Sequence, residues 1–291
     1  MPFVAPSCRL GLGLAAVGRP GYINLGRDHD LPARRSVDAL RRRSHELLDA
    51  AYAAGVRYVD VARSYGRAEE FLAAWLPGHD DVVVGSKWGY TYTAGWRVDA
   101  EVHEAKDHSP ATFERQLAES RAVLGDRLDL YQIHSVTPDS PALTDRALHR
   151  LLADLAATGV TVGLSVSGPG QAEAIRAALR VEADGAPLFR TVQATWNLLE
   201  RSAGPALREA HADGRRVIVK EGMANGRLAG RDAEALAAVL AEPFTDVVLS
   251  GAATVAQLTS NLRALDTPPA REPAPEAPED YWRTRSSLAW S

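Results

Sequence analysis

Short apolar runs alternate with amphipathic stretches along most of the chain. The runs are continuously apolar, which is typical of parallel strands that are covered on both faces. In the stretches between them apolar residues recur at helical spacing, as Leu40, Leu47 and Leu48 do. We predict strands at residues 9–13, 57–60, 81–87, 128–133, 161–165, 191–194, 216–220 and 246–250. We predict helices at residues 36–54, 68–76, 109–124, 145–158, 171–180, 204–213, 232–240 and 254–265.

Eight strand–helix units in succession predict an α/β fold, the closed (β/α)8 TIM barrel, over about residues 9–265 of a single domain that spans 1–291. An open doubly wound sheet is the alternative arrangement of the same elements. We expect long loops at the C-terminal face of the barrel and irregular structure at residues 88–108. The Pro-rich segment 266–291 is expected to be a tail or a loop that folds back over the barrel.

The composition removes several classes of function. The chain has 33 Lys+Arg against 37 Asp+Glu, a net charge of −4, which gives no electrostatic basis for binding nucleic acid or an anionic membrane. Cys8 is the single cysteine, so an internal disulfide and a multi-cysteine metal site are excluded. Residues 1–8 lack the charged and apolar regions of a signal peptide, and the cytoplasm is therefore the expected location.

Two motif matches carry little weight. Residues 11–16 (GLGLAA) fit a dinucleotide-binding pattern, but Gly18 and Pro20 follow where a helix should begin, so we interpret the match as a strand end. His103 and His108 imitate a zinc-protease pair. Their spacing of five puts them off a common helix face, and we expect them in a solvated loop.

Polar side chains stand at the C-terminal ends of successive predicted strands, where barrel enzymes carry their catalytic groups. A carboxylate, a lysine and an imidazole end or follow the second, third and fourth strands, with a tyrosine in the loop after the second. A hydroxyl and an amide stand on the next two strands. These residues are Asp60, Tyr65, Lys87, His134, Ser165 and Gln193.

The first four of these residues form a chemically coherent set. A tyrosine has an ordinary pKa of about 10, too high for efficient proton donation near neutral pH. Lys87 would lower the pKa of Tyr65, and Asp60 would keep a buried Lys87 charged. His134 can donate a hydrogen bond to a substrate oxygen. The set lacks a nucleophile, so a hydride would have to come from a bound cofactor, and neither a thiol nor a metal is required.

Four spaced segments resemble the aldo-keto reductase family: residues 60–66 (DVARSYG), 84–87 (VGSK), 128–134 (LDLYQIH) and 192–197 (VQATWN). The resemblance runs from about Leu10 to Leu265. It implies a barrel that binds NADPH or NADH in an extended form, without a Rossmann fold. It also implies Tyr65 as general acid, Lys87 and Asp60 as the pair that tunes it, and His134 as the group that orients the carbonyl.

The resemblance further implies a set of cofactor contacts. Ser165 and Gln193 match positions that hold the nicotinamide carboxamide. The last strand and helix match the part of the family that holds the adenosine end, and the loop after the seventh strand completes the set. These positions are Gly251, Ala252, Thr254, Gln257 and Asn261, with Lys220, Met223, Gly226 and Arg227 in the loop.

The chain departs from the family at three of these places. Val166 stands where an asparagine often contacts the nicotinamide, and Lys220 stands where an aromatic residue usually stacks on its ring. Lys220 and Glu221 form either a structural pair or a contact to substrate or cofactor. Gln257 replaces an arginine that often binds the 2′-phosphate, which weakens the expected preference for NADPH over NADH; Arg227 or Arg263 are candidates to replace that arginine.

Aromatic residues in the long loops predict the substrate. Tyr22, Trp88, Trp96 and Trp196 are candidate substrate contacts, which favours a small apolar or cyclic carbonyl compound or alcohol. We expect a monomer or a weak homo-oligomer. The alternative function is a nicotinamide-nucleotide-binding regulatory barrel with little or no turnover. A hydrolase that uses Ser165 is disfavoured because residues 163–167 (GLSVS) lack the final glycine of a nucleophile elbow.

Overall fold

The computed structural model describes residues 8–271 and 273–291, so the first seven residues, part of the segment read for a signal peptide, lie outside the description. Eight parallel strands close into a barrel in the order β1-β12-β11-β10-β7-β6-β3-β2. The predicted barrel is confirmed, and closure between β1 and β2 rules out the open sheet. The strands are β1 (Leu10–Gly13), β2 (Tyr58–Asp60), β3 (Val83–Trp88), β6 (Leu130–Val136), β7 (Thr161–Val166), β10 (Thr191–Thr195), β11 (Arg216–Lys220) and β12 (Val247–Ser250).

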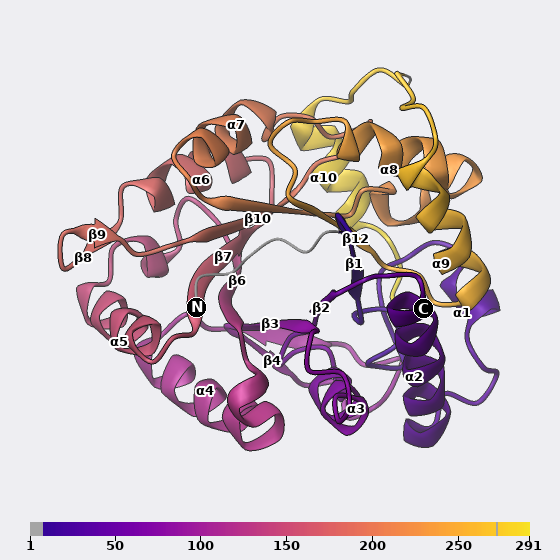
Figure 1. Ribbon diagram of the computed structural model, residues 1–291, viewed down its shortest axis with the longest axis horizontal. Coiled ribbons are helices and arrows are strands. Elements are labelled where there is room, and N and C mark those ends of the chain that lie inside the picture. Colours follow the sequence, from indigo (N-terminus) through magenta and orange to yellow (C-terminus); the bar gives the residue numbers. More distant parts are fainter. Residues whose placement is uncertain (1–7, 272) are drawn as a thin grey trace.

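Helices surround the strands, as Figure 1 shows from one end of the barrel. Ser109 caps α4 by accepting a hydrogen bond from the Thr112 N–H at 3.3 Å, with Pro110 in the first turn, as predicted. Every predicted helix is present within three residues of its expected bounds. The helices that follow strands are α2 (Val37–Ala53), α3 (Ala68–Trp75), α4 (Pro110–Leu124), α5 (Arg146–Ala157), α6 (Gln171–Leu179), α7 (Gly204–Ala212), α8 (Asp232–Leu240) and α9 (Val255–Leu262).

Three regions contain structure that the periodicity does not reveal. The stretch expected to be irregular forms an antiparallel hairpin of β4 (Tyr90–Tyr92) and β5 (Glu104–Lys106). A smaller hairpin joins β8 (Glu182–Ala183) to β9 (Ala186–Pro187), and a short helix α1 (Arg27–Asp30) lies in the first loop. Strands of two or three residues carry too little periodic signal to be recognised from sequence.

The C-terminal segment folds back on the barrel and contains a helix, α10 (Pro278–Ser286), which lies beside α8 in Figure 1. Tyr281 and Trp282 are buried with Leu198 and residues of α8. Beyond the helix, main-chain hydrogen bonds of 3.1 and 3.2 Å pair Ser291 with Tyr22. The segment is therefore a cover on the mouth of the barrel, the second of the two expected forms.

An apolar core fills the barrel interior and the layer between strands and helices. Tyr58, Leu130, Ile218, Val247 and Leu249 form an interior cluster of their own. Because all eight strands are parallel, their C-terminal ends meet at one mouth, and this geometry brings the strand-end polar residues together. No helix within the described ranges has both the length and the apolarity to cross a membrane.

Candidate active site

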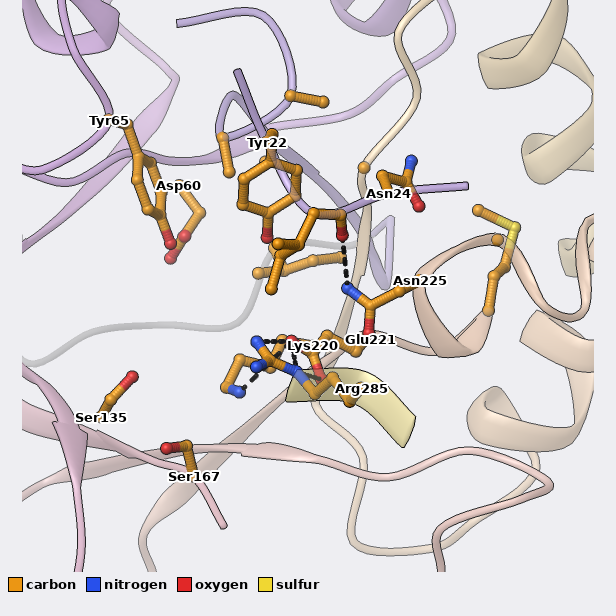
Figure 2. A pocket seen from close by; sticks show the side chains of 18 of the residues that line it. Tyr22, Asn24, Asp60, Tyr65, Ser135, Ser167, Lys220, Glu221, Asn225 and Arg285 are labelled. Carbon is orange, nitrogen blue, oxygen red and sulfur yellow. Dashed lines mark hydrogen bonds and ion pairs between the residues drawn. The ribbon is translucent and has the colours of Figure 1, made fainter. Parts of the chain in front are cut away.

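A cavity of about 330 Å³ opens at the C-terminal ends of the strands. Figure 2 shows Tyr65 and Asp60 on one side of it and Lys220, Glu221 and Arg285 on the other. The loop between β1 and α2 (loop 1), the β4–β5 hairpin and the C-terminal segment complete the wall, so residues far apart in sequence share one pocket.

Tyr65, Lys87, Asp60 and His134 form one connected cluster on the first side. Lys87 makes a buried ion pair with Asp60, and its Nζ lies 3.5 Å from the Tyr65 hydroxyl. The same hydroxyl lies 3.5 Å from Nε2 of His134. One phenol oxygen thus contacts both an ammonium group and an imidazole at the edge of the pocket.

Asp60 is held by more partners than the sequence suggests. Tyr58 donates its hydroxyl to one carboxylate oxygen at 3.0 Å, and the Gln193 amide donates to the same oxygen at 2.8 Å. Lys87 also donates to the Val61 carbonyl at 3.1 Å. These contacts offset the cost of burying a charge pair, and they give Gln193 a structural partner besides its place on the pocket wall.

The pKa of Tyr65 is raised well above its usual value, against the expected direction. Burial is the main cause and the Asp60 charge acts in the same direction, while the Arg19 guanidinium lowers the pKa. The phenol therefore stays protonated near neutral pH, and in this state it is a weaker acid than an ordinary tyrosine.

The pKa of His134 is lowered well below its usual value. Burial is the largest cause, followed by the charges of Lys87, Lys220 and Arg19. The imidazole is therefore neutral near pH 7 and has one N–H donor and one acceptor nitrogen. Ser64 Oγ lies 3.5 Å from its Nδ1.

A bulge in β6 sets the direction of the His134 side chain. The pairing of β6 with β7 shifts register between Ile133 and Val136, and Ser135 has a φ of 54°. The Ser135 N–H donates to Ser165 Oγ at 2.8 Å, and Ser165 is fully buried. Bulges re-aim side chains next to active sites, and Ser165 here stabilises the bulge from the neighbouring strand.

The second side of the pocket is built around Glu221, which follows β11 with a φ of 56°. Arg285 of α10 makes a two-pronged contact with its carboxylate, with nitrogen–oxygen distances of 2.9 and 2.6 Å. Thr195 donates its hydroxyl to Glu221 at 2.8 Å and accepts from Lys220 at 2.9 Å. Burial acts to raise the pKa of Glu221, but Arg285 and Lys220 outweigh it and lower the pKa to about 2.

Contacts of Arg19 and Trp290 hold three segments together: the loop after β1, the β4–β5 hairpin and the C-terminal segment. Arg19 is buried, donates to Glu104 and to the Ser64 carbonyl at 2.8 Å each, and lies 5.3 Å from the Tyr65 ring. The Trp290 ring stacks on His103 with centroids 4.1 Å apart and lies 4.8 Å from the Arg19 guanidinium. His103 and His108 are buried, so the expectation of a solvated loop is wrong.

The structure brings about half of the predicted site residues onto the pocket wall. Those that line it are Asp60, Tyr65, His134, Gln193, Lys220, Met223, Gly226, Gly251 and Tyr22. Lys87 lies directly beneath, in contact with Tyr65 and Asp60.

The remaining cofactor positions are occupied by internal contacts. Arg227 pairs with Glu276, and Gln257 donates to Asp30 at 2.6 Å. Thr254 caps α9, while Ala252 and Asn261 are buried, the latter 2.8 Å from Ser250 Oγ.

Three of the four predicted substrate residues lie away from the pocket, which corrects that prediction. Trp88 is fully buried against Phe113, and Trp196 packs on Phe244. Trp96 donates its indole N–H to the Arg35 carbonyl at 2.8 Å. Their aromatic character reflects loop packing, and the wall facing the cavity combines polar groups with other aromatic residues, among them Tyr90 and Trp290.

Several wall residues were missed by the sequence reasoning. They lie in the β4–β5 hairpin, at the bulge of β6, in loops and in the C-terminal segment, and they are Arg19, Glu104, Ser135, Ser167, Asn225, Arg285 and Ser286. For Arg285 the only sequence signal is a cation in a segment with aromatic residues, which does not identify its partner.

Comparison with known proteins identifies the family. The aldo/keto reductase family model matches residues 21–239. The chain belongs to the aldo/keto reductase family. A structure of an aldo-keto reductase from Pseudomonas aeruginosa superposes with a TM-score of 0.69 at 24% identity, covering 90% of this chain and 93% of that one. An aldo-keto reductase from Bacillus halodurans in its holo form gives 0.68 at 20% identity, covering 95% and 91%. These two likenesses concern the fold.

A curated aldo-keto reductase from Strobilurus tenacellus is 30% identical over 134 residues. That match covers 45% of this chain and 33% of the fungal protein. Family membership supports an oxidoreductase that acts on carbonyl groups, and the family generally uses NAD(P)H without a metal.

Proposed function

We propose that this protein interconverts an aldehyde or ketone and an alcohol with NAD(P)H as the hydride carrier. The observation that carries the proposal is the cluster in which the Tyr65 hydroxyl lies 3.5 Å from both Lys87 Nζ and His134 Nε2. A neutral phenol and a neutral imidazole on one pocket wall suit a carbonyl oxygen that gains charge and then a proton.

The pocket offers a place for an extended nucleotide. It continues from the catalytic cluster along Met223 and Gly226 to Gly251, where an added Cβ would meet nothing within 4 Å. Asn225 Oδ1 is buried on this wall, with no hydrogen-bond partner among residues 8–271 and 273–291. An unpaired buried acceptor beside accessible backbone suits a bound group that carries hydroxyl donors, as a nucleotide does.

The residues of the chain divide the work of the reaction. The bound nucleotide would supply the hydride. His134 donates a hydrogen bond to the substrate oxygen and orients it, and Tyr65 gives that oxygen its proton. Lys87 stabilises the phenolate that remains, and Asp60 forms the buried ion pair with Lys87. The C-terminal segment excludes water from the pocket.

The choice between NADPH and NADH depends on the residues that would contact the adenosine end of the nucleotide. Arg227 pairs with Glu276, and Gln257 contacts the Asp30 carboxylate, while Arg263, the other candidate cation, donates to Ser260 Oγ at 2.6 Å. The preference for NADPH therefore stays a prediction without a contact to support it, and we include both nucleotides in the proposal.

The substrate side of the pocket favours a polar carbonyl compound over the apolar one expected from sequence. Its wall contains Arg19 paired with Glu104, Arg285 paired with Glu221, and Ser135. Because both charges are matched, the wall suits a neutral molecule that forms several hydrogen bonds.

The test is Tyr65→Phe, measured with a panel of carbonyl compounds and a fluorescence titration of NADPH and NADH. We expect turnover to fall at least about 10²-fold while nucleotide affinity is retained, since general acid catalysis contributes about that much. Tyr92→Phe, in the hairpin outside the pocket wall, is the matched control. Comparable turnover in Tyr65→Phe would overturn the assignment.

A nucleotide-binding regulatory barrel is the second candidate. Two observations favour it: Gln193 donates its amide to Asp60, and Ser165 is engaged by the β6 bulge, so both expected carboxamide contacts have other partners. Tight nucleotide binding by wild type without turnover on the whole panel would select this function.

A further inference from the structure

Lysine is rare in this chain. Of the 33 Lys+Arg residues only Lys87, Lys106 and Lys220 are lysines, so arginine is the ordinary cation of the protein. Lys87 belongs to the catalytic cluster, and Lys106 lies exposed on β5. Lys220 ends β11, lines the pocket, and has no part in the proposed hydride and proton transfers.

The largely buried amine of Lys220 has no carboxylate close enough to balance its charge fully. Its side chain is 15% exposed, and its nearest Glu221 oxygen is 3.9 Å away. That carboxylate is already engaged by Arg285 at 2.6 and 2.9 Å. The close partner of Lys220 is the Thr195 hydroxyl at 2.9 Å, a neutral acceptor. Figure 2 shows the amine beside the Glu221–Arg285 pair at the cavity edge.

The surrounding charges keep this amine partly deprotonated. Burial is the largest cause, and together with Arg285 and Lys87 it outweighs Glu221 and lowers the pKa of Lys220 to about 8. At pH 7.5 about a quarter of such an amine is neutral, against about 0.1% of an ordinary lysine. The titratable groups that act on it from other elements are Arg285 of α10, Lys87 of β3, Asp60 of β2 and His134 of β6.

We propose that Lys220 is an amine nucleophile that forms an imine with small aldehydes entering the nucleotide-free pocket. The neutral Nζ adds to the aldehyde carbon, and the carbinolamine that results loses its hydroxyl and a nitrogen proton as one water. No electrons are transferred, so the step needs no cofactor and reverses by hydrolysis. Desolvation next to other cations is the usual way in which proteins activate a lysine for this chemistry.

This chemistry gives the enzyme a covalent form that competes with turnover. An aldehyde that enters before the nucleotide would be captured at Lys220. A nucleotide that binds first along the β11 and β12 loop ends would cover the amine. Covalent capture depends on the pocket and the amine alone, and only the protection by nucleotide rests on the proposed function.

The experiment traps the imine. Wild-type protein without nucleotide is incubated with glyceraldehyde and sodium cyanoborohydride, which reduces the imine to a stable secondary amine, and the adduct is located by peptide mass spectrometry. With so few lysines the assignment is direct. We expect Lys220 to be labelled at least about tenfold faster than Lys106, with a rate that rises to a plateau above about pH 8.

Matched variants separate the outcomes. Lys106→Arg should leave Lys220 labelling unchanged, and Lys220→Arg should abolish the fast adduct while its circular dichroism shows a folded barrel. Labelling of Lys220 at or below the rate of Lys106 in the wild type would overturn the proposal, whatever the variants do.

An added nucleotide distinguishes this inference from the proposed function. Fast labelling of Lys220 that saturating NADPH and NADH both leave unchanged would keep the inference and count against nucleotide binding. Nucleotide binding by titration together with an unreactive Lys220 would do the reverse.

Discussion

The two sides of the pocket are built in different ways. On the first side, Asp60 and Lys87 stand at strand ends and His134 on a bulged strand, and Asp60 has partners on the adjacent strand β3 and, across the barrel, on β10. On the second side, Glu221 follows β11 and is held by Arg285, 64 positions later in the chain. The barrel itself sets the first side, whereas the second exists only when the C-terminal segment is docked.

The difference is clearest in the two pocket lysines. Lys87 has Asp60 as a dedicated counter-ion, is buried with it, and stays in the catalytic cluster. Lys220 shares Glu221 with Arg285 and titrates near pH 8. The position of the carboxylate therefore separates the two lysines: Lys87 has one of its own, whereas Lys220 shares one with Arg285.

The largest expected effect comes from Lys87→Met. It leaves Asp60 buried without its cation, which should cost about 3–5 kcal/mol in the free energy of unfolding and at least about 10²-fold in turnover. Urea unfolding and the carbonyl assay measure both. Lys220→Met is the matched comparison. Because its carboxylate keeps Arg285, the loss of stability should stay below about 1 kcal/mol, and equal losses in the two variants would show that the sides do not differ.

This contrast also explains which parts could be predicted from sequence. Strand ends are readable because periodicity locates the strands, and parallel strands must end at one mouth. This reasoning predicts that Asp60, Lys87 and His134 lie close together, with Tyr65 in the loop after Asp60, and the structure brings the four into contact. The hairpin β4–β5 could not be predicted from the sequence, because its strands are too short to show a periodic pattern of apolar residues.

Long-range contacts were beyond sequence reasoning. Nothing local to Arg285 indicates that its partner is Glu221, and nothing local to Trp88 shows that it faces the core and not the pocket. The engagement of Gln193 with Asp60 depends likewise on barrel closure, which puts side chains 133 positions apart in contact. Tertiary packing decides these contacts, and one sequence carries no direct record of it.

The next largest effect is expected from Glu221→Gln. The change leaves Arg285 and Lys220 without a buried counter-charge, and we expect a loss of about 2–3 kcal/mol in the free energy of unfolding. The pKa of Lys220 should fall further below about 8, because Glu221 raises it. The pH profile of aldehyde labelling should then move to lower pH. A profile that stays in place would show that Glu221 does not act on the amine.

Low pH should break the contact between Glu221 and Arg285 without a mutation, because it protonates the Glu221 carboxylate. The pKa of Glu221 lies at about 2 in the folded protein, below the ordinary value of 4.5. A depressed carboxyl pKa stabilises the fold above the ordinary value, and that stability is lost as pH falls from about 4.5 toward 2. We expect the stability difference between wild type and Glu221→Gln to shrink across this window. A constant difference would contradict the assignment of the low pKa to Glu221.

The smallest effect on stability is expected from Ser165→Ala, which changes the first side of the pocket. The change removes the acceptor that the Ser135 N–H uses at 2.8 Å, so the bulge loses its support from β7. We expect the free energy of unfolding to fall by about 1 kcal/mol, as for the loss of one buried hydrogen bond. Because His134 is displaced, we also expect a several-fold lower kcat with little change in nucleotide affinity. Ser167→Ala, on the pocket wall two residues later, is the control. If Ser165→Ala instead weakens nucleotide binding and leaves kcat intact, Ser165 contacts the nicotinamide as the family resemblance implies, and the bulge stands without it.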